Sequence, residues 1–179
     1  MTVRVALIQL DCSISEPPAH RVTRALALVD RTAVESDADL VILPELWHVG
    51  AFNTDGAREH AQSINGPLVT ALGALASQHG IWLHGGSFCE IDDDGQHYNT
   101  SVLFAPDGVL VASYRKVHLF DVSIPGKVEV RESARRGHGA DVVCVDAGAA
   151  RLGLSVCYDL RFPELYRALA RYSSGKRRS

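Results

Sequence analysis

Three side chains suited to nucleophilic chemistry stand where apolar runs of the sequence end. Glu45 closes the run "LVILPE", Lys116 closes "LVASYRK" and Cys157 closes "LGLSVC". A free thiol has a pKa of about 8.5, so it needs a base or a nearby cation before it can attack a carbon atom. A buried carboxylate can accept that proton, and an ammonium group can stabilise the oxyanion that follows. Brought together, the three residues would suit acyl transfer from an amide-like carbon.

Each of these residues also has an ordinary structural interpretation. Free cysteine is among the most buried residue types, so Cys157 alone is better explained as a small core residue. Glu45 alone suits the surface or the start of a helix, and Lys116 alone suits a solvated surface. The catalytic interpretation therefore requires a fold that brings the three strand ends to one place. In open α/β sheets, sites form in the crevice at the carboxyl ends of strands.

The first half of the chain alternates between strand and helix patterns. Residues 18–35 have helical periodicity, and "GPLVTALGALASQHG" is a second predicted helix that ends at Gly80. Residues 48–65 are predicted to be loop with a short helix. Strands are predicted for "VRVALIQLD", "LVILPEL" and "IWLHGGSFCE". This order is typical of a layered α/β architecture.

The second half adds strands joined by turns. The runs "HYNTSVLF" and "VLVASYRKV" flank the turn signal "APDG", so antiparallel neighbours and a mixed sheet are predicted. Residues 118–140 show little periodicity, which is typical of a functional or disordered segment. "DVVCVD" is a further strand. "RLGLSVC" is predicted to be a strand with Leu152, Leu154 and Val156 on the face opposite Cys157. "PELYRALARY" is then a helix with proline at its first position.

The composition is that of an ordinary globular protein. The chain has 179 residues, 46% of them hydrophobic, and a net charge of −3 without a basic stripe, so no nucleic-acid partner is predicted. No signal-peptide pattern and no apolar run of about 20 residues occurs, so we expect a cytoplasmic protein with no membrane partner. The cysteines lack C-x-x-C spacing, which argues against structural zinc and a disulfide framework; they are Cys12, Cys89, Cys144 and Cys157.

Four motifs, in order along the chain, resemble those of a known family. "LPELW", "YRKVHLFD", "PGKVEVRES" and "GLSVCYDLRFPEL" together resemble the nitrilase superfamily of carbon–nitrogen hydrolases. The closest resemblance is to the Nit-type amidases, which include ω-amidase and deaminated-glutathione amidase. It implies an α/β fold of the α-β-β-α sandwich type with mixed sheets. It also implies hydrolysis of the non-peptide C–N bond of a small-molecule amide, such as an α-keto-acid ω-amide, with neither metal nor organic cofactor.

The resemblance also implies roles for individual residues. Cys157 would be the nucleophile, Glu45 the general base and Lys116 the cation that stabilises the oxyanion. Glu132 in "VRES" matches an accessory glutamate that positions the lysine and the substrate, and the backbone N–H of Tyr158 would complete the oxyanion hole. A thioester would form, ammonia would leave, and a water molecule activated by the glutamate would release the carboxylic acid.

Residues beside the nucleophile invite further interpretations. Arg161 and Glu164 in "DLRFPEL" match a motif that we expect to brace the loop after the cysteine. Asp159 and Tyr114 are expected to pack near the site without taking part in catalysis. His118, next to "RKV", leaves open a Cys-His dyad in place of the triad.

Members of the family typically continue beyond the last helix predicted here. We therefore expect residues 1–171 to form an incomplete carbon–nitrogen hydrolase domain that lacks its C-terminal third, with residues 172–179 as a polar and basic tail. This expectation leaves a second alternative, a catalytically silent fragment that acts through association. The helix after Cys157 is expected to serve in a homodimer interface.

Overall fold

The computed structural model describes residues 2–51 and 53–173, and its centre is a five-stranded mixed sheet in the order β1-β2-β3-β4-β5. The first three strands pair in parallel, and β3, β4 and β5 pair antiparallel. β2 and β5 therefore run in the same direction, and their carboxyl ends lie at the same edge of the sheet. The strands are β1 (Val5–Leu7), β2 (Leu40–Ile42), β3 (Trp82–Ile91), β4 (His97–Phe104) and β5 (Leu110–Arg115).

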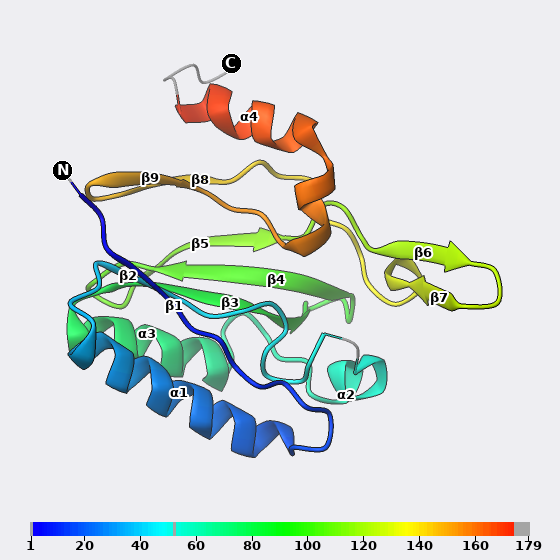
Figure 1. The fold of residues 1–179 in the computed structure, drawn as a ribbon, viewed down its shortest axis with the longest axis horizontal. Coiled ribbons are helices and arrows are strands. Elements are labelled where there is room, and N and C mark those ends of the chain that lie inside the picture. The colour runs from blue at the N-terminus through cyan, green and yellow to red at the C-terminus, as the bar shows by residue number, and fades with distance from the viewer. Residues whose placement is uncertain (1, 52, 174–179) are drawn as a thin grey trace.

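Two helices, α1 (Pro18–Glu35) and α3 (Pro67–His79), cover one face of this sheet (Figure 1). The helical periodicity of residues 18–35 predicted α1 with the observed bounds. Both helices bury an apolar stripe against β2, β3 and β4, and the resulting core includes Val29, Leu72, Leu83 and Val102. Gly80 ends α3 with a left-handed φ of 61°, as its position predicted.

The opposite face carries a hairpin of β8 (Cys144–Ala147) and β9 (Ala150–Gly153), and α4 (Pro163–Ser173) lies above it. Figure 1 shows the four resulting layers, from α1 and α3 through the two sheets to α4. A second core lies among β5, the β8–β9 hairpin and α4. Its buried residues are Tyr114, Leu154, Val156, Leu165 and Leu169. The predicted α-β-β-α sandwich is confirmed, but only the five-stranded sheet is mixed, because the second is a single antiparallel hairpin.

Residues 118–140 are more regular than their sequence suggested. They contain the hairpin of β6 (Asp121–Ile124) and β7 (Val128–Arg131), followed by the short helix η1 (Glu132–Ala134). The hairpin projects from the sandwich in Figure 1. Because its strands are only four residues long and most of their side chains are exposed, they carry little of the apolar alternation that identifies a strand.

The predicted strand "RLGLSVC" is shorter than expected. β9 ends at Gly153, and Cys157 begins a 3₁₀ turn, η2 (Cys157–Arg161), instead of closing the strand. Leu154 and Val156 are nevertheless buried together, as the alternation predicted. A short helix, α2 (Thr54–Glu59), lies in the segment predicted as loop with a short helix.

The helices and the C-terminal residues of the described chain give one further observation each. No helix among the described residues is long and apolar enough to cross a membrane. Of the segment predicted to be a polar tail, residues 172 and 173 complete α4, and residues 174–179 lie outside the described part of the chain.

Candidate active site

Side chains from four separate segments meet at the edge where β2 and β5 end. The Lys116 ammonium donates to Glu45 Oε1 at 3.1 Å and to Glu132 Oε2 at 3.0 Å. The Cys157 thiol lies near enough to Glu45 for this carboxylate to raise the pKa of the thiol. All four residues and Tyr158 line one open cavity of about 1860 Å³. The structure thus brings together the predicted nucleophile, base, cation and accessory glutamate.

The turn that carries Glu45 is held by contacts between strand ends. The residue after it, Leu46, has a left-handed φ of 45°, and its N–H donates to Ser87 Oγ at 3.1 Å. Ser87 in turn donates its backbone N–H to the Pro44 carbonyl at 3.2 Å. Non-glycine residues stay in this region of φ only where their surroundings fix them. The carboxylate of Glu45 is therefore presented by a fixed turn.

Gly86 makes the close approach of β3 to this turn achievable. Its φ is 64°, and a Cβ placed on it would lie 2.0 Å from the Pro44 carbonyl oxygen. Gly86→Ala is expected to destabilise the fold and displace the Glu45 turn. Gly80→Ala is the matched control, because Gly80 has a φ of 61° and open space around its Cβ position.

Denaturant unfolding measures both variants. We expect Gly80→Ala to cost about 1 kcal/mol, from backbone strain alone, and Gly86→Ala to cost at least about 2 kcal/mol more. Equal losses of unfolding free energy in the two variants would show that the close approach of Gly86 to Pro44 does not affect stability.

The turn that carries Cys157 is also strained. Val156 is extended, and Cys157 then adopts a left-handed φ of 48° at the start of η2. The Asp159 carboxylate accepts the Val156 N–H at 2.8 Å and closes the turn. Tyr158 stands in the first turn of η2, where backbone N–H groups have no partner within the helix. This N–H is therefore suited to the oxyanion role that the sequence motif implies.

Lys116 and Glu132 form a buried ion pair. Burial alone would lower the pKa of Lys116, but the negative charges of Glu45 and Glu132 outweigh it and raise the pKa. Burial alone would raise the pKa of Glu132, but the N–H of Phe120, 2.7 Å away, and the lysine hold it below its usual value. Both groups are therefore charged at neutral pH.

The Cys157 thiol, in contrast to these two charged groups, is neutral at neutral pH. Cys157 as a whole residue is exposed, but partial burial of its thiol, then the negative charge and hydrogen bond of Glu45, raise its pKa to about 11. Lys116 offsets only part of that shift. The resting site therefore holds a neutral thiol beside the carboxyl group of Glu45. This arrangement suits proton transfer to Glu45 during attack on a carbonyl, in place of a thiolate formed in advance.

Sequence reasoning missed two residues that hold the carboxylates. Asn99, fully buried in β4, donates its Nδ2 to Glu45 Oε1 at 2.8 Å. Arg136 donates to Glu132 Oε1 at 2.9 Å and to the Cys89 sulfur at 3.3 Å. An amide in the middle of the apolar strand "HYNTSVLF" was the available signal for the first. The spacing of four residues from Glu132 was the signal for the second.

Arg161 and Glu164 are exposed, and they are distinct from Asp159, the residue that holds the turn at Cys157. Arg161 borders the cavity, whereas Glu164 forms a 3.7 Å ion pair with Arg167 on the same helix. Their bracing role stays a prediction. The group that contacts the Cys157 turn directly is Asp159, which is fully buried behind it.

His118 is held by Asp159 and is not bonded to the thiol. Its Nδ1 lies 2.7 Å from Asp159 Oδ1, and its ring stacks on Phe162 with centroids 3.7 Å apart. Tyr114 donates its hydroxyl to the same carboxylate at 2.7 Å. None of these residues lines the cavity. The geometry therefore places His118 in a supporting cluster.

This combination of fold and sequence places the chain in a known class. A family model for carbon–nitrogen hydrolases matches residues 4–173, and the chain belongs to this family. Among curated relatives, it is 42% identical over 162 residues to ω-amidase NIT2 of Pongo abelii, covering 90% of this chain and 57% of that protein. The chain thus spans little more than half the length of the curated relatives it matches.

Solved structures agree with this assignment. Nit3 of Saccharomyces cerevisiae, a member of branch 10 of the nitrilase superfamily, is 32% identical, with a TM-score of 0.80. The match covers 95% of this chain and 60% of Nit3. An amidase from Nesterenkonia sp. is 27% identical, with a TM-score of 0.76 over 94% of this chain and 60% of the amidase. The similarity therefore extends over nearly all of the described fold.

Proposed function

We propose that the chain hydrolyses the C–N bond of a small linear amide through a thioester on Cys157, releasing ammonia and a carboxylic acid. The observation that carries this proposal is the meeting of a thiol, a carboxylate and a buried ammonium in one cavity. Glu45 raises the pKa of the Cys157 thiol beside it, and Lys116 lies 3.1 Å from the same carboxylate. Similarity to ω-amidases and to an amidase supports the choice of an amide as substrate.

The first half of the reaction forms the thioester. Glu45 accepts the thiol proton while the Cys157 sulfur attacks the amide carbon, so a C–S bond forms and the carbonyl π electrons move to oxygen. Lys116 and the Tyr158 N–H donate hydrogen bonds to this oxyanion. As the oxyanion collapses, the C–N bond breaks, and the protonated Glu45 gives its proton to the departing nitrogen, which leaves as ammonia.

The second half consumes water. Glu45, again ionised, accepts a proton from a water molecule as its oxygen attacks the thioester carbon. The same two donors stabilise the second oxyanion. Its collapse breaks the C–S bond, the glutamate returns the proton to the Cys157 sulfur, and the carboxylic acid leaves. Each group regains its starting protonation, and no redox partner or metal is needed.

The wall of the cavity favours an amide that also carries an anionic group. Arg135 and Arg161 border it and form no ion pair with the carboxylates among the described residues, whereas Arg131 and Arg136 pair with glutamates. Unpaired guanidinium groups are suited to bind a carboxylate. We therefore propose an α-keto-acid ω-amide as the first substrate to test, with the corresponding nitrile as comparison.

Ammonia release by the purified chain tests the proposal. Turnover of the ω-amide, and little or none of the nitrile, is the expected result. The absence of ammonia at high protein concentration would favour the alternative of a silent fragment that acts through association.

A Cys-His dyad using His118 is the second catalytic alternative, and one variant separates it from the triad. In His118→Asn, the side-chain amide N–H can still donate to Asp159 but cannot act as a base. The triad predicts a kcat within about tenfold of the unchanged chain, whereas a dyad predicts a loss of about 10²-fold or more. Steady-state ammonia release measures the difference.

A homodimer through α4 and a cytoplasmic location stay proposals. α4 exposes Tyr166 and Tyr172, which a second copy would cover. Sedimentation of the purified chain tests the dimer, and a Tyr166→Ser variant that sediments unchanged beside a dimeric parent would exclude that part of α4 from the interface.

A further inference from the structure

A single buried carboxylate joins the two segments that carry the cation and the nucleophile. Asp159 is fully buried, and each of its two carboxylate oxygens has two hydrogen-bond partners. Oδ2 accepts from the Tyr114 hydroxyl at 2.7 Å and the Val156 N–H at 2.8 Å. Oδ1 accepts from the His118 N–H at 3.0 Å and is 2.7 Å from His118 Nδ1. The hydrogen-bonding capacity of the carboxylate is therefore fully used.

These donors lie beside the reactive residues in the sequence. Tyr114 and His118 stand two residues before and two residues after Lys116, at the end of β5. Val156 immediately precedes Cys157 and follows the hairpin of the other sheet layer. The carboxylate consequently ties one layer of the sandwich to the other at the point where the ammonium and the thiol meet.

The turn that carries Cys157 requires a stabilising contact of this kind. Cys157 has a φ of 48°, a conformation that a non-glycine residue keeps only where its surroundings enforce it. Asp159 bonds to Val156 twice, through its carboxylate at 2.8 Å and through its own N–H to the Val156 carbonyl at 3.1 Å. The stacking of Phe162 on His118 adds a contact between the same two segments.

We infer that Asp159 is a positioning residue that sets the placement of the Cys157 sulfur relative to Lys116 and Glu45. It does so through Val156 on one side and through Tyr114 and His118 on the other. It does not line the cavity, so it acts through these groups and not on the substrate. The catalytic part of this inference rests on the proposed amide hydrolysis.

Asp159→Asn is the direct test, because it keeps the shape and removes half of the acceptor capacity. A carboxamide nitrogen cannot accept the N–H of Val156 or of His118, so one buried donor loses its partner. We expect kcat for amide hydrolysis to fall about 10²-fold, since a displacement of about 1 Å has that effect. KM should stay within about threefold, because the cavity wall is unchanged.

A second readout does not depend on the substrate. Site-resolved mass spectrometry can follow the alkylation of Cys157 by iodoacetamide. Burial and Glu45 raise the pKa of this thiol to about 11, so releasing the turn should move the pKa toward its ordinary value. Each pKa unit changes the thiolate fraction tenfold, so alkylation of Asp159→Asn near pH 8 should be at least about tenfold faster.

Two further variants separate positioning from general loss of stability. Val29→Ala removes core volume beneath α1, and it should lower the melting temperature while leaving kcat and the alkylation of Cys157 unchanged. Tyr114→Phe removes one donor only, and it should shift both readouts in the direction of Asp159→Asn by a smaller factor. It also keeps the test open if Asp159→Asn does not fold.

The two readouts keep this inference distinct from the proposed function. If the unchanged chain releases no ammonia, the proposed function fails, and alkylation still reports on the turn. Unchanged Cys157 alkylation in Asp159→Asn and in Tyr114→Phe would overturn the positioning role. So would a loss of kcat in Val29→Ala equal to that in Asp159→Asn at matched stability.

Discussion

Replacing Cys157 by alanine is expected to abolish ammonia release from the amide, a loss on the order of 10⁴-fold or more. The proposed reaction forms its covalent bond at this sulfur, and methyl in its place cannot attack a carbon. Cys89 also lines the cavity but cannot substitute for it, because its thiol is buried and is contacted by Arg136 at 3.3 Å. Burial also raises the pKa of the Cys89 thiol.

Cys144→Ala is the matched control for this experiment. Cys144 lies in β8, outside the cavity, so its replacement should leave turnover within about twofold of the unchanged chain. Circular dichroism would verify that both variants fold. Substantial ammonia release by Cys157→Ala would contradict the assignment of the nucleophile.

Replacing Glu45 by glutamine should change two measured rates in opposite directions. Amide turnover should fall by about 10²–10⁴-fold, because the carboxamide cannot accept the thiol proton. Alkylation of Cys157 should become faster near neutral pH. The negative charge and the hydrogen bond of Glu45 both raise the thiol pKa, so their removal lowers that pKa from about 11 and increases the thiolate fraction.

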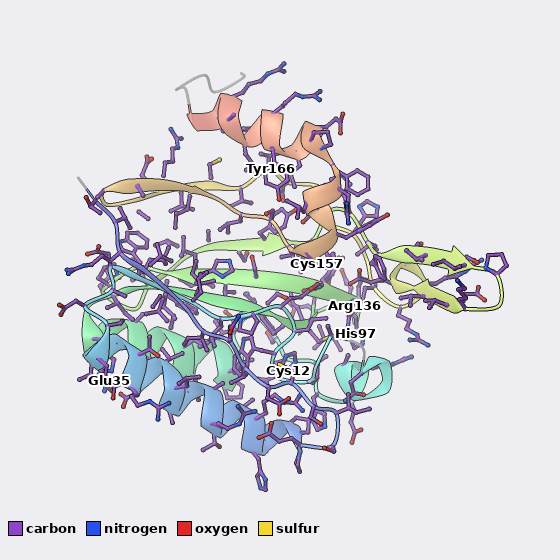
Figure 2. All side chains as sticks on the ribbon, viewed as in Figure 1. Cys12, Glu35, His97, Arg136, Cys157 and Tyr166 are labelled. Carbon is purple, nitrogen blue, oxygen red and sulfur yellow. The ribbon has the colours of Figure 1, made fainter. Side chains whose placement is uncertain are left out.

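The substitution Glu45→Gln can preserve the hydrogen bonds that hold this side chain. Asn99 and Lys116 both donate to one oxygen of Glu45, and the amide oxygen of the variant can accept the same two bonds. Glu35→Gln is the control, since Glu35 is an exposed carboxylate at the end of α1, far from Cys157 in Figure 2. Parallel losses of turnover and alkylation would indicate a collapsed site and would contradict the assigned role of Glu45.

Much of the fold was predictable because its elements have strong local signals. α1 has the predicted bounds, since its apolar residues recur with helical spacing and a proline opens it. The strands before Glu45 and Lys116 were predictable from their apolar runs, although β2 ends at Ile42 and Glu45 lies in the turn that follows. The motifs then supplied Glu132, whose place beside Lys116 depends on the β6–β7 hairpin that local sequence did not reveal.

The supporting contacts were not predictable, because they join residues far apart in the chain. Asp159 binds Tyr114 and His118 across more than forty residues, and Asn99 reaches Glu45 across fifty-four. No local pattern encodes such a contact. The left-handed backbone at Cys157 likewise depends on these tertiary contacts, which explains why the strand pattern of "RLGLSVC" extended too far.

Trapping of the acyl-enzyme tests the central claim most directly. The purified chain would be mixed with the ω-amide, quenched in acid and measured by intact-mass and peptide mass spectrometry. We predict an added mass equal to the substrate minus ammonia, located on the peptide that contains Cys157 and removed by hydroxylamine, as expected of a thioester. Ammonia release without any such adduct on Cys157, under conditions that trap the intermediate of a known thiol amidase, would contradict the account.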